Sequence, residues 1–198
     1  MPNGKKTYDI IPAQGIIDAR KVQEQGIDRR NLGLLCDSGQ LVRVARGLYA
    51  SPNQELTQHH SLAIASKLVP KGVVCLLSAL RFHVIGTGVP TAVAMALPAR
   101  SWLPHIRDLP MEFHRVNAAC YQAGIERHTI EDCQVPIYSP AKTVADCFRF
   151  RADIGLERAI EALRETVAAR KATIAQIHDM ARICRVGNVI LPYLEAIA

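Results

Sequence analysis

The stretch DARKVQEQGIDRRNLGLLCDSGQLVRVARGLYA, residues 18–50, decides the predicted fold of the N-terminal part of the chain. It opens with a short polar helix expected over residues 19–25. Asp18 can cap this helix by accepting a hydrogen bond from a free backbone amide, and Gly26 can end it in the left-handed conformation. The pattern therefore predicts a helix of two turns with both ends defined.

A second helix is expected directly after this one, over residues 29–37. Asp28 offers its cap, and Leu32, Leu35 and Cys36 fall at the spacing of a buried helical stripe. Two short helices joined by a tight turn that contains glycine predict a helix-turn-helix.

A two-stranded hairpin is expected to follow. Val42 and Val44 alternate with Arg43, so the two valines are predicted to face inward and the arginine outward. Gly47 suits a turn that needs a positive φ, and residues 48–50 return as the partner strand. A hairpin directly after a helix-turn-helix is a wing, and the combined order predicts a winged helix-turn-helix.

The second helix begins with Arg29, Arg30 and Asn31. The N-terminal residues of a recognition helix are those that reach base edges in the major groove of DNA. Arginine can make two hydrogen bonds to guanine, and asparagine can make two to adenine. These three residues are therefore the predicted base-reading residues.

Four further cations are predicted to contact DNA around this helix. Arg43 lies along the hairpin and Arg46 at its tip, while Arg20 and Lys21 lie on the preceding helix. We assign Arg46 to phosphate, because a single cation at a wing tip most often meets the backbone. The alternative is that Arg29 and Arg30 form a solvated surface, or that the winged unit binds a protein or only packs.

The rest of the chain has a different pattern after the linker at residues 51–53. It predicts a mixed α+β fold with its helices concentrated toward the C-terminus, and hence a winged domain over residues 1–53 and an α+β domain over residues 54–198. Helices are expected over residues 58–68, 78–83, 139–148, 156–169, 174–184 and 190–197, and strands over residues 73–75, 91–97, 111–116 and 135–138. Pro136 predicts that the last of these strands is an edge strand or begins there, and Ser139 with Pro140 marks the start of the following helix.

Composition limits the classes of function. A net charge of +6 and a pI near 9.1 favour an anionic partner such as double-stranded DNA. The six cysteines are widely spaced, without a Cys-x-x-Cys pair, and read as small hydrophobic residues in a reducing compartment. We expect no metal and no cofactor. Because no apolar run reaches membrane-spanning length and residues 1–6 lead into no signal-peptide core, we expect a cytoplasmic protein without a membrane partner.

Two alternatives remain open on the residues alone. A metal-dependent nuclease needs clustered carboxylates, for which Glu131 with Asp132, or Glu112 with His114, are the nearest candidates. No phosphate-binding loop or nucleophile motif accompanies them, so we predict no catalytic residue. A protein-interaction module is the second alternative, with Arg100 and the single tryptophan, at position 102, as candidate contacts in a loop flanked by prolines.

The sequence resembles the AbiEi-type antitoxin family of type IV toxin–antitoxin systems. The resemblance is carried by residues 15–50, 83–90, 97–100, 135–148, 162–165 and 182–189. It implies an autorepressing regulator whose winged domain binds repeats in the promoter of its own operon. It also implies a cognate nucleotidyltransferase-like toxin, with the C-terminal domain required for antitoxicity and a stable complex with the toxin not required. Only about fifteen residues precede the helix-turn-helix, so the first helix of the winged domain is expected to be short.

Overall fold

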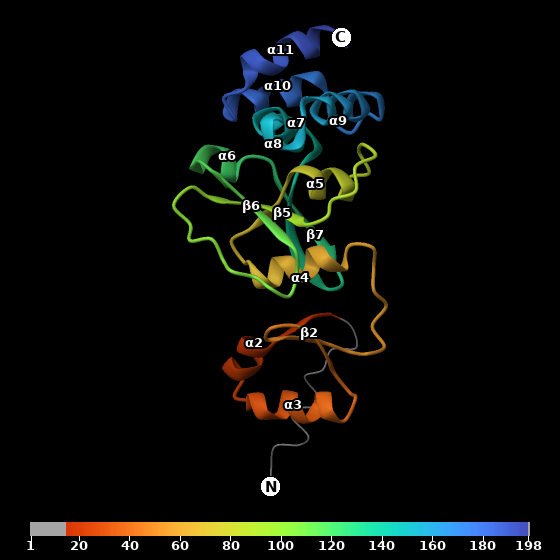
Figure 1. Cartoon of the computed structure of the whole chain (residues 1–198), viewed down its shortest axis with the longest axis vertical. Helices are drawn as coiled ribbons and strands as arrows, with labels where there is room; N and C mark the ends of the chain where they lie inside the picture. The colour runs from red at the N-terminus through yellow and green to blue at the C-terminus, as the bar shows by residue number, and fades with distance from the viewer. Residues whose placement is uncertain (1–14, 198) are drawn as a thin grey trace. The chain divides into compact units, whose positions relative to one another are not determined.

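The computed structural model describes residues 15–197 (Figure 1). The expected first helix of the winged domain lies outside these residues. The chain divides into two compact units. Within the described range, unit 1 contains residues 15–70, 106–109 and 128–135, and unit 2 contains residues 71–105, 110–127 and 136–197. The predicted boundary after residue 53 therefore falls inside unit 1, because the helix that follows the linker groups with the winged elements.

Unit 1 contains the helix-turn-helix and hairpin that the sequence predicts. Strand β1 (Ile17–Asp18) leads into α2 (Ala19–Glu24) and α3 (Arg29–Asp37), and β2 (Val42–Ala45) and β3 (Leu48–Ala50) follow. The three strands form an antiparallel sheet in the order β1-β3-β2. Figure 1 shows α2 and α3 beside this small sheet. Their shared core consists of Ile17, Ala19, Val22, Ile27, Leu32, Leu35 and Leu41.

The predicted caps of both helices are confirmed. An Asp18 side-chain oxygen accepts a hydrogen bond of 2.8 Å from the Arg20 amide, and Asp28 accepts one of 2.9 Å from the Arg30 amide. Gly26 has a φ of 81°, in the left-handed region that ends a helix. These local bonds satisfy amides that a helix leaves free at its start.

The hairpin does not bury the residues that the sequence predicted. Val42 is 43% exposed and Val44 is only half-buried, whereas Ala45 is buried. The reason is a shift in register between Arg43 and Ala45, which interrupts the strict alternation of faces along β2. Gly47 takes a φ of 75° in the turn, as predicted, and its carbonyl accepts a hydrogen bond from the Ala19 amide.

Unit 1 also includes α4 (His60–Leu68) and residues 128–135. The carboxylate of Glu131 connects these two segments. Glu131 accepts hydrogen bonds of 2.9 Å from both the amide and the hydroxyl of Thr57, and one of 3.0 Å from Gln54 Nε2. Its Oε2 also lies 2.6 Å from His60 Nδ1. Burial alone raises the pKa of the Glu131 carboxyl, but the bonds from His60 and Thr57 outweigh it, so the pKa lies below its usual value.

The larger sheet is mixed, in the order β6-β5-β4-β8-β7; most of its residues belong to unit 2, and residues 128–130 and 133–135 of β7 and β8 group with unit 1. Its strands are β4 (Val73–Val74), β5 (Val93–Pro98), β6 (Met111–Val116), β7 (Ile125–Ile130) and β8 (Cys133–Tyr138). The prediction for Pro136 was wrong, because β8 lies between β4 and β7 and starts three residues earlier. Strand β4 has only two residues, and its Val74 pairs with Ile137 of β8, so little pairing is lost at the proline. The sequence did not predict β7.

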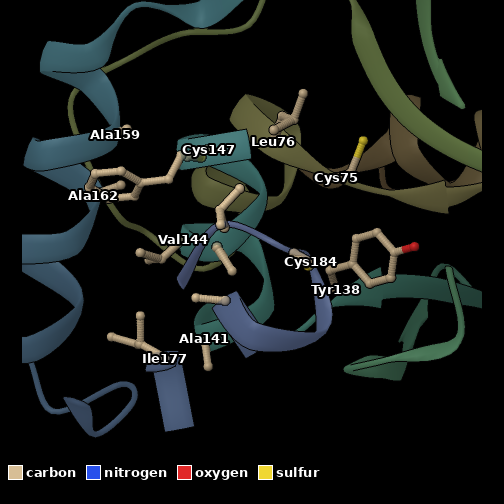
Figure 2. Close-up of a cluster of buried hydrophobic side chains, with 14 of the residues drawn as sticks. Cys75, Leu76, Tyr138, Ala141, Val144, Cys147, Ala159, Ala162, Ile177 and Cys184 are labelled. Atoms are coloured by element: carbon tan, nitrogen blue, oxygen red, sulfur yellow. The ribbon is translucent and has the colours of Figure 1, made fainter. Parts of the chain in front are cut away.

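Helices gather on one side of this sheet (Figure 1). They are α5 (Leu76–Phe82), α6 (Ala118–Gln122), α7 (Pro140–Arg149), α8 (Arg151–Ile154), α9 (Leu156–Ala168), α10 (Ile174–Ile183) and α11 (Gly187–Glu195). Helix α7 is the centre of the core and packs against α5, α9 and α10. Figure 2 shows Val144 and Cys147 of α7 among Ala159, Ala162 and Ile177 of the neighbouring helices. The fold class is α+β, as predicted.

Helix α7 starts as the sequence predicts and carries a buried ion pair. The Ser139 hydroxyl accepts from the Lys142 amide, and Pro140 stands in the first turn. Lys142 is 0% exposed, and its Nζ lies 2.5 Å from an oxygen of Asp146, one turn later. The same Nζ lies 4.0 Å from the centroid of the Tyr138 ring. The lysine therefore has both an opposite charge and an aromatic face as partners.

All six cysteines are free thiols; Cys36 is half-buried and the other five are buried. Burial raises the pKa of the Cys184 thiol to about 12. This agrees with the prediction that the cysteines act as small core residues. Within residues 15–197, none of the helices is long and apolar enough to cross a membrane.

Candidate nucleic-acid interface

The seven predicted contact residues are located in unit 1, and all except Asn31 are exposed. Arg20 and Lys21 lie on α2, Arg29, Arg30 and Asn31 at the start of α3, and Arg43 and Arg46 on the hairpin and its turn. Their exposure follows from the buried stripes of α2 and α3, which turn the charged positions away from the core.

A hollow of about 260 Å³ brings three of these cations together. Arg20, Arg29 and Arg46 line it, and Lys67 of α4 contributes a fourth cation. Asp18 also lies at this hollow, but one of its oxygens already accepts the bond that caps α2. Clustered guanidinium and ammonium groups around a concave surface suit a phosphate group, which can accept several charge-assisted hydrogen bonds at once.

Lys67 was missed by the sequence reasoning. It follows the linker, so the pattern placed it in the second domain and on an ordinary amphipathic helix. The local sequence carries no signal for its role, since only the packing of α4 with the winged elements in unit 1 brings it to the hollow.

Helix α3 presents a separate exposed stripe. Arg30, Gly33, Leu34 and Asp37 are exposed and follow the helical spacing of one face, whereas Leu32 is buried on the opposite side. Asn31 is half-buried beside this stripe. Arg29 and Arg30 therefore have different surroundings, because Arg29 lines the hollow and Arg30 leads the exposed stripe.

Arg43 has a contact within the hairpin. Its Nε donates a hydrogen bond of 3.4 Å to the Ala45 carbonyl, across the point where the register shifts. Lys21 is exposed on α2 and is not among the residues that line the hollow. The geometry thus separates Arg20, Arg29 and Arg46, which share one concave surface, from Lys21 and Arg43.

The carboxylates considered for a nuclease have other surroundings. The hydrogen bonds described above occupy both oxygens of Glu131. Glu112 and His114 line a hollow of about 250 Å³ in unit 2 together with Asp153 and Arg158. Burial lowers the pKa of His114. In the part of the chain that the structure describes, no group of three or more histidine, cysteine or acidic side chains could hold a metal ion.

The loop after β5 exposes the single tryptophan. Trp102 is 90% exposed, and Arg100 two residues before it is also exposed. The common role of a tryptophan as a packing anchor therefore does not apply here.

Comparison with known proteins finds a family match for the segment that carries the seven predicted contact residues. Residues 11–52 match the family described as a transcriptional regulator, AbiEi antitoxin. The resemblance seen in the sequence is confirmed over residues 11–52. It spans the helix-turn-helix and the hairpin, and so includes every predicted contact residue.

The fold as a whole is similar to that of a solved structure. The crystal structure of the RV2827C protein from Mycobacterium tuberculosis superposes with a TM-score of 0.60 at 15% sequence identity, covering 96% of this chain and 75% of that one. At this identity the likeness concerns the fold alone. No curated protein matches the chain.

Proposed function

We propose that this chain is a sequence-specific, double-stranded DNA-binding transcriptional regulator that represses its own operon as the antitoxin of a toxin–antitoxin pair. The observation that carries the proposal is the cluster of Arg20, Arg29, Arg46 and Lys67 around one hollow beside the exposed stripe of α3. The AbiEi-type match over residues 11–52 supports the same function.

The two surfaces have different roles in this mechanism. A DNA phosphate occupies the hollow, where its charge is neutralised and the register of α3 along the groove is fixed. The start of α3 then enters the major groove, with Arg30 toward a guanine edge. Lys21 and Arg43 contact the flanking backbone, and Asn31 contributes near the start of the helix. Binding is strongly salt-dependent, because each neutralised phosphate releases condensed counterions.

The partners proposed beyond DNA follow from the family resemblance. The cognate toxin is a nucleotidyltransferase-like protein encoded in the same operon, the operator carries repeats, and the pair acts in the cytoplasm. The α+β domain, residues 54–198, carries the antitoxic activity, which does not require a stable complex with the toxin.

The test is a gel-shift titration with the DNA upstream of the chain's own gene, at two salt concentrations. The R29A/R30A double variant should lose about 1–3 kcal/mol of specific binding free energy from the base contact of Arg30, and in addition the phosphate contact of Arg29 at the hollow. R164A/R182A is the matched control, because it removes two exposed arginines from α9 and α10 and leaves the winged elements intact. Equal affinity of wild type and R29A/R30A would remove the assignment of the site.

A second function is favoured by Trp102. A tryptophan that is 90% exposed suits a protein contact, since tryptophan is enriched at the centres of interfaces. Because it is the only tryptophan in the chain, its fluorescence reports on this loop alone. Adding the product of the neighbouring gene should change this emission. The same product should co-purify with the wild type but not with W102A. An unchanged emission would count against the contact.

A further inference from the structure

The exposed stripe of α3 contains a leucine that the core does not use. Leu34 is 65% exposed, whereas Leu32 and Leu35 of the same helix are buried at 3% and 5% exposure. The core of unit 1 includes Leu32 and Leu35 but not Leu34. This large apolar side chain is therefore available to a partner in the middle of the helix that begins with Arg29 and Arg30.

We propose that Leu34 is a base-reading residue that contacts the 5-methyl group of a thymine in the major groove. The proposal rests on the DNA-binding function proposed above and adds a sequence preference to it. The thymine methyl is the apolar group that the base edges present in the major groove, and side chains with apolar carbons recognise it.

The neighbours of Leu34 on the helix allow a base edge to approach. A Cβ added at Gly33 would meet nothing within 4 Å, so the surface beside Leu34 is open. Arg30 lies one turn before Leu34 on the same face, and Asp37 one turn after it. A carboxylate at the end of the stripe accepts from the amino group of cytosine and repels phosphate, so this face favours bases over backbone.

The separation of Arg30 and Leu34 along α3 predicts how far apart the two bases that they read lie in the DNA. Four residues of α-helix advance by about 6 Å, at about 1.5 Å per residue. Base pairs in DNA are about 3.4 Å apart, so Arg30 and Leu34 reach bases about two steps apart when the helix lies along the groove. The preferred site therefore contains a guanine for Arg30 and, about two base steps away, a thymine for Leu34.

The charge around the stripe favours DNA over a protein as the partner of Leu34. Arg30 is on the stripe itself, and Arg29, the residue before it, lines the cationic hollow. A leucine that docked a second copy of this chain would bring these like charges together, which costs free energy.

The test uses duplexes that the wild-type protein selects from a random pool. Each thymine of the selected site is replaced in turn by deoxyuridine, which lacks only the methyl group. We expect one replacement to weaken wild-type binding about fourfold, the effect of losing one buried methyl-sized group. L34A and L34Q should bind the thymine duplex and its deoxyuridine counterpart equally. R30A should still prefer the thymine duplex, but its binding should no longer be weakened when 7-deazaguanine replaces the guanine proposed for Arg30.

The possible failures have different meanings. If the wild type selects a site and every deoxyuridine duplex binds as tightly as its parent, Leu34 reads no methyl group and this inference is overturned. If the wild type selects no sequence, the proposed function fails and takes the inference with it. A changed oligomeric state of L34A with the discrimination intact would assign Leu34 to a contact between copies and would also overturn the proposal.

Discussion

Helices α3 and α7 begin alike but use their cations in opposite ways. Each starts with a side-chain cap, Asp28 for α3 and Ser139 for α7, and each has a cation in its first turn. Arg30 of α3 is exposed to solvent. Lys142 of α7 is 0% exposed, pairs with Asp146 and lies against the Tyr138 ring.

The difference shows which cations can recognise a partner. A cation buried with its counter-ion serves the fold, because removing either partner leaves an uncompensated charge in the core. An exposed cation adds little to stability and is available to a phosphate or a base. The two helices should therefore respond in opposite ways to the same kind of substitution.

The largest effect is expected at the buried pair. K142M leaves the Asp146 carboxylate without its counter-ion and should lower the free energy of unfolding by about 3–5 kcal/mol. Urea denaturation measures this change, and the K142M/D146L double variant should recover much of it, because neither charge is then buried alone. If K142M were as stable as the wild type, the lysine would not serve the fold and the contrast with α3 would fail.

A glycine beside Lys142 sharpens the same contrast. A Cβ at Gly124 would lie 2.6 Å from Lys142 Cβ, and the φ of this residue is +66°. G124A should therefore lower the free energy of unfolding by overpacking, about 1–3 kcal/mol, in addition to about 1–2 kcal/mol of backbone strain. G26A is the matched control, since Gly26 has a φ of +81° with nothing near its Cβ position, and it should show the strain alone. Equal losses in the two variants would mean that the close approach to Lys142 has no cost.

Glu131 is a third charged group that serves the fold, and its effect depends on pH. Because the folded pKa of this carboxyl lies below its usual value, its stabilisation is present above the ordinary glutamate pKa and is lost as the pH falls through the folded pKa. E131Q should be less stable than the wild type by about 1.5–3 kcal/mol near neutral pH, the range for hydrogen bonds to charged groups. The difference should shrink at an acid pH below the folded pKa of this carboxyl, where the wild-type glutamate has taken up its proton. Thermal unfolding of wild type and E131Q at the two pH values measures the stability difference at each. A difference that grew on acidification would contradict the predicted direction.

The smallest effect is expected at the tip of the wing. R46A should leave thermal stability unchanged and weaken binding to all DNA sequences alike. Loss of one phosphate contact lowers the slope of log affinity against log salt by about 0.9. R20A, at the same hollow, should behave in the same way. A change in sequence preference with R46A would move this residue from phosphate to base contact.

The sequence predicted what depends on neighbours along the chain. The caps at Asp18 and Asp28, the ends of α3, the positive φ of Gly26 and the start of α7 at Ser139 all follow from short-range rules. Each involves backbone groups only a few residues away, so the residue types suffice to define it.

What depends on distant segments could not be predicted. The interior position of Pro136, the bonds of Glu131 to Thr57 and the arrival of Lys67 at the hollow each require segments far apart in the sequence. The exposure of Leu34 does not belong to this class, because the helical spacing of Leu32, Leu35 and Cys36 already places Leu34 outside the buried stripe.

The central claim is that the start of α3 lies in the major groove with Arg30 toward guanine. Dimethyl sulfate footprinting tests it directly, because the reagent methylates guanine N7, the atom that the arginine would cover. On saturated operator DNA, the wild type and R46A should protect the same guanines, and R30A should lose protection of one guanine in each bound site. An R30A footprint identical to that of the wild type would contradict the account.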